Sequence, residues 1–581
     1  MCLTAAAALS QTPPAPTTAP APAQTAPPID KNAPEISTKE APALFQTRVN
    51  LVSVPVVVRD SKGHAIGTYT KENFQVFDKG KPQEIVRFAL EKAGDLVAKA
   101  AKTVDAIPIE GEPAADIDIP ERFIAFLFDD IHLPVGDLAR ARIAAGRQLA
   151  KLAKTDRAAI HTTSGQNQVD FTDDIDKLQA DLLLLRNRSM SNMGGQPQCP
   201  DISAYMADRM VNFNDTPAIN LAVQEVQMCV GGGANGPQMP AQAAQSMVLG
   251  LAQQVIGASE QETRINLGVL KDLVRHMSAM PGQRVVIVVS PGFLATQQTQ
   301  EKNDIMDRAV KASVVINSLD ARGLYTDPMF DASQPGRSQT PQFQILKEQY
   351  DRDAASIQGD VLAELASGTG GSFFHNNNDI EQGFHLAAAA PEYYYVLGFS
   401  PQNLKLDGSF HSLKVVIKPP PGSGMDIQAR KGYYAPKKLS DAEETAKEEM
   451  GEALFSRDEL SDLPVELHTQ YFKASDKDAT IAVVCRLDPR HIQFRKADGR
   501  NINTLKVVSA VFDRNGNVLS VIQKTLEIKM KDETLARLQA IGAMSIKTNF
   551  SVTPGSYMVR LVVRESEGQL MSALNGAVAI Q

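Results

Sequence analysis

The sequence lacks the features that mark several classes of protein. It has no run of about 18 apolar residues, so we expect no membrane-spanning helix. It has no surplus of basic residues, since 59 Lys and Arg stand against 67 Asp and Glu, for a net charge of −8. No segment of the sequence is rich in Lys and Arg, and together with the negative net charge this argues against a nucleic-acid partner. The four cysteines form no CxxC pair or Cys/His cluster, so no zinc site is expected.

Motifs that carry catalysis are missing as well. The chain contains no nucleophile elbow, HExxH pair, Walker A loop or dinucleotide fingerprint. Gly368, Gly370 and Gly371 resemble a phosphate loop, but no GK[ST] follows them, and a turn before a strand explains them better. We therefore expect a non-catalytic protein without a cofactor, and keep an uncharacterised enzyme as an alternative.

Residues 1–44 are rich in Pro, Ala and Thr, and their composition predicts a disordered linker. The small residues at the start resemble the end of a signal peptide, without its basic start or full apolar core. We expect an export signal whose true start lies upstream, and hence a periplasmic, cell-surface or secreted protein. The alternative is a low-complexity tail on a cytosolic protein.

A chain of 581 residues is too long for one domain, and its patterns change several times. Alternating apolar and polar residues predict a small β module at 45–92, followed by a linker at 93–120. Strand patterns return in a β extension at 401–436. A charged helical linker at 437–454 then leads to a β-sandwich of immunoglobulin-like size at 455–581.

The segment 121–400 alternates strands with helices. Arg122–Phe128 and Arg284–Val289 are continuous apolar runs, typical of strands buried on both faces. A long helix is expected at about 264–279. Residues 187–245 form a Gly-, Asn- and Met-rich insertion. Strands that alternate with helices predict a parallel, doubly wound sheet with helices on both faces.

This α/β segment resembles the von Willebrand factor A domain, a Rossmann-like fold. The resemblance rests on RFIAFLFDD, DRAAIHT, PGQRVVIVVSPGF and LAELASGTGGSFF, in that order. Over about 45–581 the chain resembles the VWFA-related Acidobacterial domain family. The segments that carry this likeness are VNLVSVPVVVRDSKG, ENFQVFDKGKPQEI, FLFDDIHL, YYYVLGFSP, FHSLKVVIK, RKGYYAP, LPVELHTQYF and PGSYMVRLVVRE. These segments specify fold rather than chemistry.

The resemblance implies a Mg²⁺ site on a DxSxS loop after the first strand, completed by a distant Thr and Asp. Here the first Asp aligns as Asp129 or Asp130. The two serine positions then hold Ile131 and Leu133, or His132 and Pro134. Ser290 stands where the distant Asp is expected, and Thr263 precedes a helix near the place of the Thr.

An aliphatic side chain cannot replace a hydroxyl ligand, so we expect a degenerate metal site. Our interpretation of Asp129 and Asp130 is a turn and helix-capping pair. Weak Mg²⁺ or Ca²⁺ binding at a rearranged site of Asp129, Asp130 and Ser290 stays open.

Cys199 and Cys229 lie together in the insertion, and we expect them to form a disulfide. The alternative is two reduced thiols in a cytosolic protein. Taken together, the sequence predicts an exported protein that binds an unknown protein partner or assembles with the envelope. A structural envelope protein without a ligand site is the alternative, and the oligomeric state is open.

Overall fold

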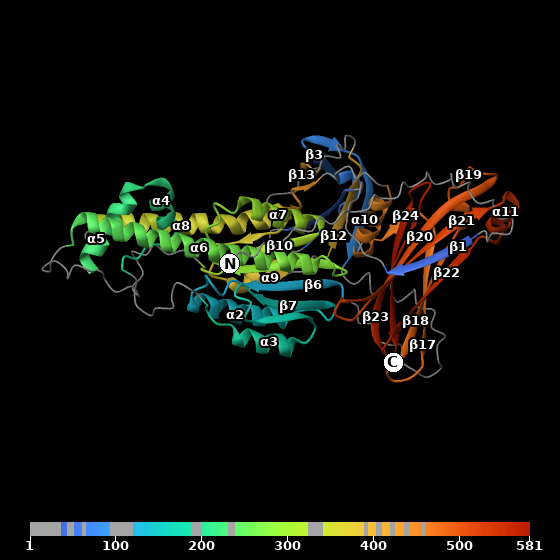
Figure 1. The fold of residues 1–581 in the computed structure, drawn as a ribbon, viewed down its shortest axis with the longest axis horizontal. Helices are drawn as coiled ribbons and strands as arrows, with labels where there is room; N and C mark the ends of the chain where they lie inside the picture. Colours follow the sequence, from blue (N-terminus) through green and yellow to red (C-terminus); the bar gives the residue numbers. More distant parts are fainter. Residues whose placement is uncertain are drawn as a thin grey trace, which may run out of the picture.

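A computed structural model describes residues 36–42, 52–60, 65–92, 120–188, 199–229, 239–323, 341–388, 393–401, 409–418, 425–434, 442–455 and 459–580. The chain is multidomain. An α/β domain reaches one end of the elongated molecule, a β unit lies beside it, and a β-sandwich forms the opposite end (Figure 1).

The α/β domain is built on one open six-stranded sheet. Its strands are β6 (Arg122–Phe128), β7 (Asp156–Thr162), β8 (Gln168–Thr172), β9 (Gln283–Ser290), β10 (Val314–Asp320) and β11 (Phe373–Phe374). They lie in the order β11-β10-β9-β6-β7-β8, and every neighbouring pair is parallel except β7 with β8. Every residue of β6 and β7 is buried, and for β6 the apolar run predicted a strand covered on both faces.

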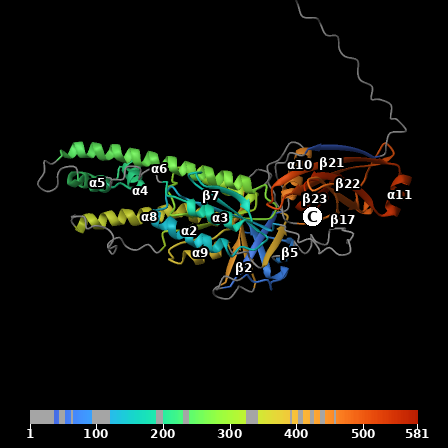
Figure 2. The same ribbon diagram turned by 90° about the horizontal axis from the view of Figure 1, so that it is seen from below.

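Helices cover both faces of this sheet. One face packs against α2 (Val135–Leu149), α3 (Ile175–Leu184) and α9 (Ile380–Ala388). The other packs against α6 (Ala241–Met277), α7 (Thr299–Lys311) and α8 (Pro341–Thr369). Figure 2 shows α6 above the sheet and α2 and α9 below it. Alternate residues of β6 feed the two cores, so Phe126 faces α9 while Leu127 faces α6.

A helical arm extends beyond the sheet (Figure 1). It contains α4 (Ala204–Phe213), α5 (Thr216–Cys229) and the first halves of α6 and α8, which share a separate core. The helix expected at 264–279 in fact begins at Ala241 and, at 37 residues, is about 55 Å long. The predicted insertion contains α4 and α5, and the first turn of α6 lies within its bounds.

The strands before and after the α/β domain form a single β unit. One sheet has the order β14-β2-β12-β5 and the other β15-β13-β3-β4. Their bounds are β2 (Val52–Arg59), β3 (Phe74–Asp78), β4 (Lys81–Gln83), β5 (Ile85–Lys92), β12 (Tyr393–Phe399), β13 (Phe410–Ile417), β14 (Asp426–Ala429) and β15 (Gly432–Tyr434).

This arrangement corrects the predicted boundaries. The module at 45–92 and the extension at 401–436 share one core, and β12, assigned to 121–400, lies between β2 and β5. A period of two shows which residues of a strand face inward, but it does not identify the partner strand. For that reason the sequence separated strands that pair across some 300 residues.

The C-terminal region is a β-sandwich, as predicted. A seven-stranded sheet contains β1 (Ile36–Pro42), β16 (Leu460–Ser461), β19 (Arg495–Ala497), β20 (Arg500–Phe512), β21 (Val518–Met530), β23 (Gly555–Glu565) and β24 (Met571–Ile580). A three-stranded sheet of β17 (Val465–Lys473), β18 (Ala479–Leu487) and β22 (Met544–Val552) packs on it across a shared core. Helix α11 (Asp532–Ile541) connects β21 to β22.

Two segments expected to be linkers belong to this sandwich. Residues 36–42 form β1 and pair antiparallel with β21, although composition assigned them to a disordered linker. An edge strand is held by backbone hydrogen bonds, which do not require apolar side chains. Helix α10 (Ala442–Phe455), expected as a charged linker, buries Met450 and Leu454 against the seven-stranded sheet.

Candidate functional site

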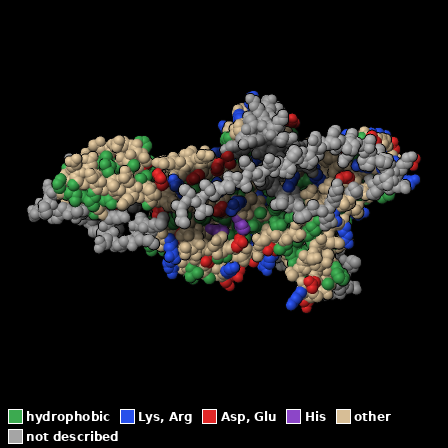
Figure 3. Space-filling view, in the orientation of Figure 1, with side chains coloured by type: hydrophobic (Ala, Val, Ile, Leu, Met, Phe, Trp, Pro, Cys, Tyr) green, Lys and Arg blue, Asp and Glu red, His purple; other side chains and the backbone are tan. Residues whose placement is uncertain are grey.

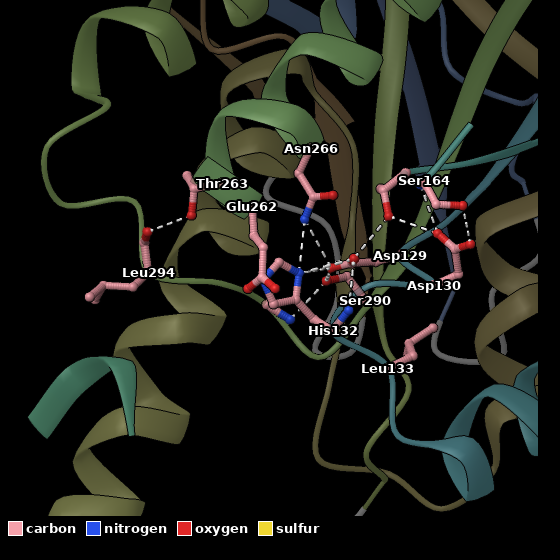
Figure 4. A network of polar contacts seen from close by, with 12 residues as sticks. Asp129, Asp130, His132, Leu133, Ser164, Glu262, Thr263, Asn266, Ser290 and Leu294 are labelled. Carbon is pink, nitrogen blue, oxygen red and sulfur yellow. Dashed lines mark hydrogen bonds and ion pairs between the residues drawn. The ribbon is translucent and has the colours of Figure 1, made fainter. Parts of the chain in front are cut away.

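A polar cluster lies at the carboxyl edge of the parallel sheet (Figure 4). Asp129 and Asp130 directly follow β6, Thr163 and Ser164 follow β7, and Ser290 is the last residue of β9. Neighbouring parallel strands end at the same edge, which brings these side chains together. In open α/β sheets this edge is where ligands bind.

Asp129 is the centre of the cluster and is 1% exposed. Its Oδ2 accepts a hydrogen bond from Ser290 Oγ at 2.6 Å and one from Asn266 Nδ2 at 3.2 Å. Its Oδ1 accepts from Thr163 Oγ1 at 3.1 Å and from the backbone N–H of His132 at 3.2 Å. Two carboxylate oxygens offer about four lone-pair sites in all. Four protein donors therefore contact this carboxylate in addition to the His132 imidazole.

Asp130 turns toward the loop after β7. Its Oδ1 accepts from the Ser164 backbone N–H at 2.9 Å, and Ser164 Oγ donates to Oδ2 at 2.5 Å. Its backbone carbonyl oxygen accepts from the N–H of Arg188 at 2.7 Å. Asp130 thus joins the ends of two neighbouring strands. The predicted helix-capping role is not found, because the N-cap of α2 is Pro134, without a side-chain cap hydrogen bond.

His132 lies between two buried carboxylates. Its Nδ1 is 2.9 Å from Asp129 Oδ2, and its Nε2 is 3.5 Å from Glu262 Oε2 on α6. The ring stacks on Phe293, with centroids 5.8 Å apart. Burial alone lowers the pKa of an imidazole, but the charges and hydrogen bonds of Asp129 and Glu262 raise the pKa of His132 to about 10. The two carboxylates therefore favour the protonated imidazolium, and Asn266 Nδ2 also lies 3.0 Å from Nδ1.

The same contact acts on Asp129. Burial alone would raise the pKa of the carboxyl group, but the charge of His132 and the hydrogen bonds from His132 and Ser290 hold that pKa below its ordinary value. The two residues form an ion pair in which the Asp129 side chain is 1% exposed and the His132 side chain 18%.

Three of the four residues predicted for the metal site meet here, and one does not. Asp129 bonds to Ser290 and shares Thr163 with Asp130. Thr263 lies in the interior of α6, and its Oγ1 donates to the carbonyl oxygen of Leu294 at 2.9 Å (Figure 4). The sequence missed this placement because the helix begins far upstream of Thr263.

The residues present do not fit a bound metal. Ile131 and Leu133, which stand at the hydroxyl positions of one alignment, are 5% and 0% exposed. Protein donors already occupy the Asp129 carboxylate. Among the residues that the structure describes, no group of three or more His, Cys, Asp or Glu side chains is placed to hold an ion.

The cluster contains Ser, His and Asp, but they are not connected as a catalytic triad. A triad needs the serine hydroxyl on one imidazole nitrogen and the carboxylate on the other. Here Ser290 Oγ donates to Asp129, and the two nitrogens of His132 face Asp129 and Glu262. Ser290 is also completely buried. The arrangement contains no activated nucleophile.

Sequence reasoning missed four members of the cluster: Thr163, Ser164, Glu262 and Asn266. The first two follow the second strand directly, so the shared edge of parallel strands was a signal for them. Glu262 and Asn266 are four residues apart on α6, which places them on one helix face. That signal required the true start of the helix.

Cys199 is disulfide-bonded. Its Sγ lies 3.8 Å from the carbonyl oxygen of Glu225, in the last turns of α5, which ends at Cys229. The side chain of Cys229 lies outside the described residues, so the pairing of Cys199 with Cys229 stays a prediction. Cys485, in the sandwich, is buried with a free thiol.

None of the helices in the described ranges combines the length and apolar character that crossing a membrane requires.

No protein-family model matches the chain, and no curated protein matches it. Among solved structures, the conserved hypothetical protein BatB from Bacteroides thetaiotaomicron is 13% identical over 47% of this chain and 100% of that one, with a TM-score of 0.21. A calcium-binding mutant of Bacteroides uniformis beta-glucuronidase 2 is 15% identical over 20% of this chain, with a TM-score of 0.14.

A glycosyl hydrolase family 2 member from Bacteroides cellulosilyticus is 7% identical over 32% of this chain, with a TM-score of 0.16. The chain spans 13% of the length of the beta-glucuronidase and 20% of that of the hydrolase. At these TM-scores the three likenesses carry no functional argument.

Proposed function

We propose that the chain is an exported, non-catalytic protein that binds another protein through a von Willebrand A-like α/β domain. One observation carries the proposal. The strand order of the sheet reverses between β6 and β9, and Asp129 and Ser290 stand at the ends of those two strands. Such a reversal point is where open α/β sheets bind ligands. The doubly wound order also supports the resemblance to the VWFA-related Acidobacterial family.

The helical arm offers the larger contact surface. Phe213 on α4 is 61% exposed and Ile345 on α8 is 54% exposed. Figure 3 shows hydrophobic side chains at this end of the molecule, with few charged ones among them. The Arg209 guanidinium lies 4.8 Å over the Phe213 ring. Exposed apolar side chains, aromatic residues and arginine are typical of protein-binding surfaces.

The contacts within the polar cluster support a non-catalytic role, because Ser290 donates its hydrogen bond to Asp129 and His132 forms an ion pair with the same carboxylate. The disulfide-bonded Cys199 and the Pro/Ala/Thr-rich start support export, since disulfides persist in oxidising compartments. Fractionation of the native host tests this part, and recovery of the chain in the cytosol alone would contradict it.

A pull-down from envelope extract of the native host tests binding. The baits are the unchanged chain, a Phe213→Ser/Ile345→Ser double variant of the arm, and an Ile541→Ser control on α11, where the side chain is 72% exposed. We expect the unchanged chain and the control to capture the same protein, and the arm variant to lose it. Equal capture by all three baits would contradict a role for the arm.

A structural envelope protein without a site at the sheet edge is the second candidate. Phe472 and Ile541 favour it, because they leave 71% and 72% of their surface exposed on the sandwich. Capture that is lost in Ile541→Ser and kept in the arm variant would select this candidate.

A further inference from the structure

Two acidic side chains lie on either side of His132, on separate elements of the α/β domain. The Asp129 side chain is 1% exposed and the Glu262 side chain 10%. Burying a carboxylate is costly unless a cation or several donors compensate its charge. In the described ranges, neither residue has an ion pair with any lysine or arginine, and His132 is the cation they share.

We propose that the His132 side chain takes the place of a metal cation at this edge of the sheet and balances the charges of Asp129 and Glu262. Removal of the imidazole would then open a cation site between these two acids. The inference concerns the cluster itself, and it holds whether or not the domain captures a protein partner.

The position of the ring is the first support. Nδ1 is 2.9 Å from Asp129 Oδ2 and Nε2 is 3.5 Å from Glu262 Oε2, so the imidazole spans the gap between the two acids. The Phe293 ring stacks on the imidazole and thereby restricts the orientation of its plane.

Unused acceptors are the second support. Glu262 Oε1 and Asn266 Oδ1 are buried, and neither has a hydrogen-bond partner in the part of the chain that the structure describes. Glu262 is 7% exposed and Asn266 3%. Glu262 also faces the ring through Oε2, whereas Asn266 turns its Nδ2, and not its Oδ1, toward Asp129 Oδ2 and His132 Nδ1 (Figure 4). Oxygen ligands suit Mg²⁺ and Ca²⁺.

Removing the imidazole should therefore expose a site that the natural side chain fills. His132→Ala leaves the acids of residues 129 and 262 without a cation, beside the unpaired Oε1 of Glu262. Such a variant should lose stability in EDTA and regain it with a divalent ion. The unchanged chain should respond to neither, because its cation is covalently part of the protein.

The experiment uses the purified full chain and follows thermal unfolding in EDTA, in MgCl₂ and in CaCl₂. It compares the unchanged protein with His132→Ala, His132→Lys and a His132→Ala/Asp129→Asn double variant. His276→Ala is the matched control, because it also removes a histidine bonded to an aspartate, with Nε2 3.1 Å from Asp170. Calorimetry with MgCl₂ and CaCl₂ measures binding directly.

We expect either ion to raise the unfolding midpoint of His132→Ala by roughly 5 °C or more at a hundredfold excess over Kd. The double variant should lose this response, and the unchanged chain, His132→Lys and His276→Ala should show none. If His132→Ala does not fold under any condition while His132→Lys folds, a cation is still required at this position, and the inference stands.

Three results would overturn the inference. One is EDTA-reversible binding of Mg²⁺ or Ca²⁺ by the unchanged chain. Another is a His132→Ala protein as stable in EDTA as His276→Ala. The third is failure of both His132→Ala and His132→Lys to fold, since a positive charge alone would then not replace the ring.

Discussion

The guanidinium of Arg157 in β7 donates from Nε to the backbone carbonyl oxygen of Arg514, in the turn between β20 and β21, across 2.7 Å. The Arg157 side chain is completely buried. Beside it, Gly516 of the same turn lies against the ring of Phe123, near the start of β6. The sandwich therefore docks at the amino end of the parallel sheet, opposite the edge that carries Asp129.

The docked turn leaves no room for a side chain at position 516. A Cβ there would lie 2.2 Å from Cζ of Phe123, and Gly516 has a φ of +86°. We predict that Gly516→Ala destabilises the chain and increases proteolysis between the α/β domain and the sandwich. The measurements are thermal unfolding and limited proteolysis.

Gly499→Ala is the matched control. Gly499 has a φ of +68°, with nothing within 4 Å of its would-be Cβ. Both alanines pay the cost of a left-handed backbone, about 1–2 kcal/mol, and only the one at 516 also meets Phe123. Equal losses in the two variants would show that the contact with Phe123 contributes nothing.

A buried polar group joins strands far apart in the sequence. Asp78 at the end of β3 contacts His411 Nδ1 on β13 at 2.9 Å and accepts a hydrogen bond from the Tyr433 hydroxyl on β15 at 2.8 Å. Asp78→Ala removes the acceptor that His411 and Tyr433 share, at a cost of about 1–3 kcal/mol for a group left unpaired. The Tyr433 hydroxyl also lies 3.1 Å from His411 Nδ1, and that contact remains. We predict a large loss of unfolding free energy, measured by denaturant titration.

Tyr433→Phe provides the comparison for this prediction. It removes a hydroxyl while leaving the contact of Asp78 with His411 in place, so it should cost only about 1 kcal/mol. A Tyr433→Phe loss as large as that of Asp78→Ala would mean that the acid does not hold the three strands together.

The sequence predicts local features of this fold well. Continuous apolar runs identified β6 and β9, and the alternation of strands with helices predicted the open sheet. Partners were harder to predict. The contact of Asp78 with His411 crosses 333 positions, and nothing in either strand indicates the other.

The candidate site shows the same division. Asp129, Asp130 and Ser290 were found through the resemblance to the von Willebrand A domain, whose metal site lies at the ends of the corresponding strands. Glu262, the partner of His132 on α6, was not found. It lies in the middle of a helix whose first turns have an atypical composition. Thr263, its neighbour, was placed in the site by the same error in the helix start.

The disulfide prediction concerns the helical arm. Cys199 is disulfide-bonded, and we expect Cys229 to be its partner. A crosslink that closes a loop of about 30 residues stabilises a protein by up to about 3.5 kcal/mol. Alkylation without reduction, followed by peptide mapping, should leave both residues unlabelled and recover one linked peptide. Labelling of both residues in protein from its native compartment would contradict the pairing and weaken the case for export.

The last prediction concerns His161, on β7. Its side chain is nearly buried, at 9% exposure, and its Nε2 has no hydrogen-bond partner in the described part of the chain. Burial lowers the pKa of His161 to about 4, although the charge of Asp170 opposes the shift; His276 adds to it. The unfolded chain has the ordinary pKa of about 6.5.

Because the folded-state pKa is the lower one, the unfolded chain binds a proton at this residue first as the pH falls. The stability that a neutral His161 preserves is complete above about pH 6.5 and is lost as the pH falls toward 4. We predict that the unchanged chain loses about 2 kcal/mol more unfolding free energy than His161→Leu between about pH 7 and about pH 5. Leucine fills a similar volume and does not titrate, so groups shared by both proteins cancel. Denaturant titrations at the two pH values measure the difference, and parallel losses in the two proteins would show that His161 does not contribute to acid sensitivity.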